Sequence, residues 1–69
     1  MTDTKALIEV INNSGLKLKF IAEKVGITRQ SLSNKIHNKS CFNAAEIMAL
    51  CKVLNIKSTV EKDKLFYHE

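Results

Sequence analysis

Residues 26 to 40, GITRQSLSNKIHNKS, concentrate side chains that form directed hydrogen bonds. The stretch offers a guanidinium group, amides, ammonium groups and hydroxyls, but few apolar side chains. Catalysis by Ser31 or Ser33 would need a base held beside the hydroxyl, and neither serine has a positioned base. The composition of the stretch therefore favours binding of a partner over a covalent reaction.

Among the possible classes of function, an enzyme is the one that the sequence supports least. A chain of 69 residues buries a thin core and cannot easily enclose a deep substrate pocket. Its acidic residues are scattered singly, and its two glycines, Gly15 and Gly26, are too far apart for a phosphate-binding loop. We therefore predict a protein that is not an enzyme and that has no cofactor.

A metal site is also not expected. The candidate ligands show neither a CxxC nor an HxxxH spacing. We predict that Cys51 is a small buried apolar residue on a helix and that both thiols are reduced. The candidate ligands considered are Cys41, Cys51, His37 and His68.

Positive charge is concentrated in the middle of the chain, within a formal net charge of +4. Residues 1–14 carry one basic and two acidic residues, a net charge of −1. Residues 15–40 carry six basic residues and one acidic residue, a net charge of +5, while residues 41–69 balance four against four. A clustered positive face is typical of proteins that bind polyanions, although a basic surface that only aids solubility has the same signature.

The composition, 45% hydrophobic and 26% charged, is ordinary for a globular domain. No apolar run approaches the roughly 20 residues that span a membrane. The first residues, MTDTKALIEV, lack the basic and apolar regions of a signal peptide. These features predict a cytoplasmic protein.

Four amphipathic helices follow from apolar spacing and from helix-ending residues. We expect helices over residues 4–13, 18–25 and 44–54, and another that begins at Arg29 and is terminated by Asn38, without proline to interrupt them. Each is followed by a residue that tolerates left-handed backbone angles, and an apolar residue comes after three of these. The terminating residues are Gly15, Gly26, Asn38 and Asn55.

The fourth helix has the strongest start signal. In FNAAEI, Asn43 and Glu46 have the spacing of a capping box, and Phe42 and Ile47 that of a hydrophobic staple. Residues 57–69 are less clear and fit a short helix, a strand or an irregular packed arm. The residues expected to face the core are Leu7, Val10, Ile11, Leu18, Ile21, Ala22, Val25, Leu32, Ile36, Ile47, Leu50, Cys51 and Leu54.

The second and third predicted helices are joined by a turn of a few residues. Gly26 allows the backbone to turn, and the small Ala22 four residues earlier allows the two helices to cross closely. Ile27, Leu32 and Ile36 can complete their shared core. This arrangement is a helix-turn-helix.

The segments IAEKVGITRQSLS and FNAAEIMALCKVLNI resemble the lambda-repressor and Cro-like (XRE-type) helix-turn-helix family. The likeness covers about Leu7 to Ile56 and is closest to small temperate-phage proteins, either Cro or modulators of repression. It implies an all-α, four- to five-helix fold. We expect one domain, 1–69, with its core at 4–56 and with 57–69 packing on that core or at a dimer contact.

The resemblance implies which residues of the third helix would meet DNA. Arg29, Gln30 and Asn34 match positions that face base edges, and Thr28 would cap the helix near the phosphate backbone. Arginine binds guanine through two hydrogen bonds, and glutamine or asparagine pairs with adenine. A solvated surface and a protein interface stay open as alternatives for these side chains.

Other polar residues would support that contact. Lys35 and Lys39 would lie nearer the phosphates, and the lysines at 17, 19 and 39 fit loose phosphate contact or a solubilising role equally well. The full predicted DNA- or partner-binding set is Thr28, Arg29, Gln30, Ser31, Ser33, Asn34, Lys35, Lys39, Lys17 and Lys19.

Two functional hypotheses follow from the resemblance. The first is a transcriptional regulator of a phage lysogeny switch, in the bacterial host cytoplasm, binding double-stranded operator DNA as a homodimer on a pseudo-palindrome. The second is an anti-repressor, or modulator of repression, that binds the cognate phage repressor protein. Two departures from the family pattern motivate the second: Leu18 replaces a glutamine that often contacts phosphate, and Lys35 replaces a usually apolar residue.

Overall fold

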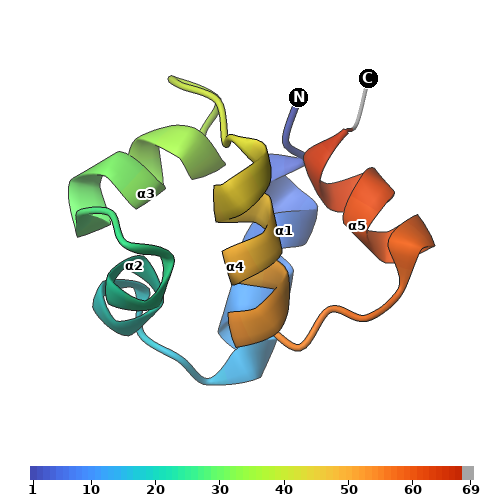
Figure 1. The fold of residues 1–69 in the computed structure, drawn as a ribbon, viewed down its shortest axis with the longest axis horizontal. Coiled ribbons are helices and arrows are strands. Elements are labelled where there is room, and N and C mark those ends of the chain that lie inside the picture. The colour runs from blue at the N-terminus through green and yellow to red at the C-terminus, as the bar shows by residue number, and fades with distance from the viewer. Residues whose placement is uncertain (68–69) are drawn as a thin grey trace.

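The computed structural model describes residues 1–67, which form five helices and no strand (Figure 1). In Figure 1, α2 and α3 lie at one end of the molecule, α5 lies at the other, and α1 and α4 lie between them. The described part of the chain is therefore all-α, as predicted. The helices are α1 (Thr4–Ser14), α2 (Leu18–Val25), α3 (Arg29–Ile36), α4 (Ala44–Val53) and α5 (Thr59–Phe66).

All four predicted terminating residues have left-handed backbone angles. Gly15 and Gly26 have φ values of 73° and 90°, and Asn38 and Asn55 have values of 62° and 59°. Their positions confirm that these residues end the first four helices. The predicted ends were close: α1 continues one residue further, to Ser14, whereas α3 and α4 stop before residues 38 and 54.

Side-chain caps begin most of the helices. Asp3, Thr28 and Ser58 each accept a hydrogen bond from a first-turn amide, whereas Lys17, before α2, makes no such bond. At α4 the capping box is complete: Asn43 accepts from the Glu46 amide, and the Glu46 carboxylate accepts from the Asn43 amide. This confirms the strongest start signal in the sequence.

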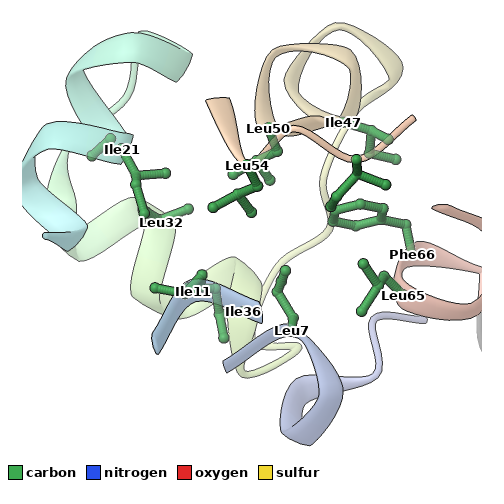
Figure 2. Packing of buried hydrophobic residues seen from close by; sticks show 12 residues of the cluster. Leu7, Ile11, Ile21, Leu32, Ile36, Ile47, Leu50, Leu54, Leu65 and Phe66 are labelled. Carbon is green, nitrogen blue, oxygen red and sulfur yellow. The ribbon is translucent and has the colours of Figure 1, made fainter. Parts of the chain in front are cut away.

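A single apolar cluster joins the five helices, and Figure 2 shows its side chains converging. Most of the predicted core is buried, but Val10, Leu18, Val25 and Cys51 are only half-buried and pack around its edge. The buried apolar residues are Leu7, Ile11, Ile21, Ala22, Leu32, Ile36, Ile47, Leu50, Leu54, Ile56, Leu65 and Phe66.

The C-terminal segment forms α5, which resolves the three alternatives left open by the sequence. Ser58 caps the helix, and Leu65 and Phe66 turn into the core. The Phe66 ring packs edge-on against Phe42, with centroids 5.7 Å apart, while Tyr67 is exposed. The start of the chain lies beside the end of α5 (Figure 1). No helix in the described range is long and apolar enough to cross a membrane.

Candidate nucleic-acid interface

The α2–α3 pair is held at a fixed angle by a tight turn and a small buried residue. The amides of Gly26 and Ile27 both donate to the Ala22 carbonyl, at 2.9 and 3.0 Å. Ala22 and Leu32 are almost fully buried. Close packing at Ala22 and a rigid turn at Gly26 therefore set how α3 projects from the molecule.

The outer face of α3 carries two linked amides. The Gln30 side-chain nitrogen donates to the Asn34 side-chain oxygen at 3.1 Å, across one helical turn. Helical spacing places this pair opposite Leu32 and Ile36, which are buried. The pair leaves the Asn34 nitrogen as a donor and the Gln30 oxygen as an acceptor, which are the groups that recognise a base edge.

The N-terminal end of α3 is exposed and ordered by its cap. The Thr28 hydroxyl accepts from the Ser31 amide at 3.0 Å, and the Arg29 side chain lies in the open. The free amides of a first helical turn attract anions, and an exposed guanidinium beside them adds a full positive charge. This end of α3 is therefore suited to approach a negatively charged partner.

The Lys35 side chain is paired with an acidic residue, although the sequence predicts a phosphate contact for it. Its ammonium group lies 2.7 Å from both carboxylate oxygens of Glu46, and the two side chains are only 16% and 10% exposed. Helical spacing puts Lys35 on the flank of α3 that faces α4, where the capping carboxylate already lies. The Lys35 charge thus joins α3 to α4, and it is the lysine of the predicted set that is paired in this structure.

Glu46 serves both α3 and α4. Its carboxylate accepts from the Lys35 ammonium and from the Asn43 amide. The hydrogen bond from Lys35, followed by that from the Asn43 backbone, lowers the pKa of Glu46 below its ordinary value. The residue is 8% exposed and stays ionised in the folded protein at neutral pH.

The C-terminal end of α3 is fastened to the start of the chain. The Asn38 amide oxygen accepts from the Thr2 backbone at 3.0 Å, and its nitrogen donates to the Thr2 carbonyl at 2.9 Å. The Thr4 hydroxyl donates to the Ile36 carbonyl at 2.6 Å. The Asp3 amide donates to the Leu65 carbonyl at 2.8 Å, so residues 2–4 connect α3 to α5.

The remaining members of the predicted set lie around α3. Lys17, Lys19 and Lys39 are exposed, whereas Ser31 and Ser33 are half-buried. A cavity of about 180 Å³ is shared by α1, the start of α2 and the end of α3, and none of the predicted lysines lines it. The residues lining this cavity are Ile8, Ile11, Asn12, Leu18, Ser33, Ile36 and His37.

The geometry of α2 and α3 agrees with a comparison of the sequence with protein families. A helix-turn-helix family model (HTH_3) matches residues 7–61, which is most of the chain. The chain belongs to this helix-turn-helix family. Neither a search of curated proteins nor a search of solved structures gives a match.

Family membership establishes the general activity. The helix-turn-helix protein is a DNA-binding transcription regulator with a lambda-repressor-like fold, and its general partner is double-stranded DNA. Members of this family are typically non-enzymatic. The α2–α3 pair is the motif after which the family is named, and α3 is the second helix of that motif.

The cysteines of the helix-turn-helix protein lie away from this motif. Cys41 is exposed and Cys51 is half-buried, and burial raises the pKa of the Cys51 thiol. Among residues 1–67 no group of three or more His, Cys, Asp and Glu side chains could hold a metal ion, while His68 lies outside the described residues. The helix caps at Thr28 and Asn43 were predicted from the sequence, but the Lys35–Glu46 pair was not. The only sign of that pair in the sequence is that two oppositely charged residues lie eleven positions apart.

Proposed function

We propose that the protein is a sequence-specific regulator of a temperate-phage lysogeny switch, acting through operator DNA. Arg29, Gln30 and Asn34 enter the major groove and contact base edges. Thr28 and the first-turn amides of α3 bind one phosphate, and Lys17, Lys19 and Lys39 bind others along the backbone. The likeness of the segments around α2, α3 and α4 to Cro-like proteins supports the phage assignment.

One observation carries this proposal: the Gln30–Asn34 pair on the exposed face of a helix that is fixed on its other sides. A base-reading helix gains specificity when its side chains are held before DNA arrives, because less entropy is lost on binding. The bond between Gln30 and Asn34 orders two side chains at once. The surrounding charge attracts a polyanion, since residues 15–40 carry a net charge of +5, six basic residues against one acidic.

A short recognition helix reads few base pairs, so we propose that two copies bind one pseudo-palindromic operator. In a symmetric dimer the two copies of α3 would meet half-sites about one helical turn of DNA apart. Sedimentation of the protein with and without an operator duplex measures the stoichiometry. Two chains per duplex are expected, and one chain per duplex at saturation would argue against the dimer.

The DNA proposal is tested by fluorescence titration of a labelled duplex from the switch region next to the gene. We expect binding at least about a thousandfold tighter than to random duplex, the lower end for specific regulators. Arg29→Ala should remove much of this preference. Lys64→Ala, which also removes one positive charge but lies on α5, is the matched control. Weak binding, equal for both duplexes and lost at moderate salt, would overturn the proposal.

A second candidate function is modulation of repression through binding of the cognate phage repressor protein. The observation that favours it is the engagement of Lys35 by Glu46, which removes one free cation from the DNA-facing helix. Leu18 is half-buried and offers no polar group where the family often has a phosphate-binding glutamine. The small side chains of Ser31 and Ser33 on α3 also fit an interface with a protein partner.

Co-purification with the neighbouring repressor distinguishes the two candidates. If the protein is an anti-repressor, Arg29→Ala and Asn34→Ala abolish repressor binding, and wild-type protein shows no operator preference. If it is a direct regulator, the same substitutions reduce operator preference and leave any repressor contact unchanged.

A further inference from the structure

A lysine-rimmed groove lies between α2 and α4 and continues along the loop that leads to α5. Three adjoining hollows, of about 510, 310 and 240 Å³, form this groove. They are neighbours on one face, since Lys52 lines all three, and Met48, Lys24 and Val53 each line two. None of the residues predicted to contact DNA lines it.

The floor of the groove is apolar. Phe20 and Met48 are 43% and 64% exposed, and both are large side chains that would normally be covered. Smaller apolar residues lie between them on the exposed side of α4. The floor consists of Phe20, Ala45, Met48, Ala49 and Val53, with Cys51 and Ile56 at the end nearer α5.

All charged residues on the rim of the groove are basic. Four lysines line the three hollows, and no acidic residue does. The Lys24 ammonium lies 5.4 Å from the centre of the Phe20 ring, so part of this charge sits directly above the floor. The rim lysines are Lys24, Lys52, Lys57 and Lys62.

We propose that this groove binds an acidic amphipathic helix of a partner protein. A helix can lie along the space between α2 and α4 with its apolar face against Phe20, Met48 and Val53. Acidic residues on both flanks of such a helix would meet the lysine rim, which provides orientation and steers association. Because the groove shares no residue with the predicted DNA-contacting set, the protein can hold DNA and this partner together.

Charge argues against a second copy of the chain in this groove, and the apolar floor argues against DNA. A second copy in a symmetric contact would place the four lysines against the same four lysines, and like charges facing each other oppose association. DNA would match the lysines but leave the apolar floor uncovered. An acidic helix with an apolar face matches both parts of the groove.

The probe is a synthetic helical peptide of about 18 residues, with leucines at i, i+3, i+4 and i+7 and glutamates beside them. It is titrated into the isotope-labelled full chain, and amide shifts are followed by nuclear magnetic resonance. We expect saturable shifts at Phe20, Met48 and Val53. A second peptide with lysine in place of each glutamate should give no saturable shifts.

Two variants test the site itself. Met48→Glu should weaken peptide binding about tenfold or more, because it removes a buried apolar contact and adds a repelling charge. Val60→Glu is the matched control: Val60 is 69% exposed on α5 and lines none of the three hollows, so affinity should change less than about twofold. Circular dichroism should show the same fold for both variants.

Five results would overturn the proposal. The peptide fails to bind, its shifts map outside the groove, or Met48→Glu and Val60→Glu bind it equally. The fourth is a shift of the groove residues on raising protein concentration without peptide, which would assign the groove to a second copy. Displacement of the peptide by duplex DNA would likewise count against it. Failure of operator binding with retained peptide binding would contradict only the function proposed above.

Discussion

The helices α3 and α4 are neighbours joined by one ion pair, yet they are stabilised in different ways. α4 begins with a complete capping box and buries Glu46, Ile47 and Leu50. α3 begins with a simple threonine cap and buries only Leu32 and Ile36. α3 is therefore held largely by contacts with other segments, made through Lys35, Asn38 and Thr4.

This difference explains how so polar a helix can lie in a small domain. The contacts of α3 with the core and with its neighbours use one side and the two ends of the helix. Its remaining side carries the exposed Gln30 and the half-buried Asn34, whose side chains are bonded to each other. α4, by contrast, has its inner face committed to the core, and its outer face forms the floor of the lysine-rimmed groove.

The largest effect is expected from truncation of the two fully buried leucines that these helices contribute. Leu32→Ala and Leu50→Ala should each lower the free energy of unfolding by about 2–5 kcal/mol, because each leaves a cavity in the cluster. Urea denaturation followed by circular dichroism measures the loss. Val60→Ala, at an exposed site, should stay within about 0.5 kcal/mol of wild type. If Leu32→Ala were as mild as Val60→Ala, α3 would not share the core.

The next largest effect is a loss of operator affinity without a loss of stability, caused by a substitution on α3. Arg29→Ala should reduce operator affinity by about 1–3 kcal/mol, roughly 5- to 150-fold, and should relax preference at one base pair. The exposed Arg29 side chain makes no contact needed for folding, so the unfolding free energy should change by less than about 0.5 kcal/mol. Titration at two salt concentrations checks this. A uniform loss across all duplex sequences would instead identify Arg29 as a phosphate contact.

The elements that could be predicted from sequence are those with local signals. Gly15, Gly26 and the Asn43–Glu46 box act within one helical turn, so their spacing alone identifies the ends of α1, α2 and the start of α4. The exposed face of α3 could also be predicted, because only Leu32 and Ile36 have core spacing.

The features that could not be predicted depend on packing between distant segments. The Asn38 link to Thr2 joins residues 36 positions apart, and the sequence offered only a left-handed turn there. The Lys35–Glu46 pair requires the angle between α3 and α4, which no local signal encodes. α5 was ambiguous because it is short and turns only Leu65 and Phe66 inward, which is too little to distinguish helical spacing from alternation.

A smaller loss of stability is expected when a helix cap is removed. The consequence for operator binding should differ between α3 and α4. Asn43→Ala and Thr28→Ala each remove the acceptor for one first-turn amide and should cost about 1 kcal/mol of stability. Only Thr28→Ala should also weaken operator binding, since it frays the end of α3 that carries Arg29. Thermal unfolding and duplex titration of both variants measure this. Equal operator binding by the two would mean that the first turn of α3 does not meet the DNA.

The smallest effect is a dependence of stability on pH that arises from one carboxyl group, Glu46. Its pKa is lowered in the folded state, so the folded protein binds this proton less readily than the unfolded chain does. The resulting stability is present above the unfolded pKa, about 4.3, and is lost as pH falls through the lower folded value. Glu46→Gln should therefore flatten the acid limb of a stability curve measured by urea denaturation between about pH 3 and 6. Glu23→Gln, which makes the same substitution at an exposed site on α2, is the matched control. A Glu46→Gln curve as steep as wild type would show that the bond between Lys35 and Glu46 does not hold α3 to α4 in solution.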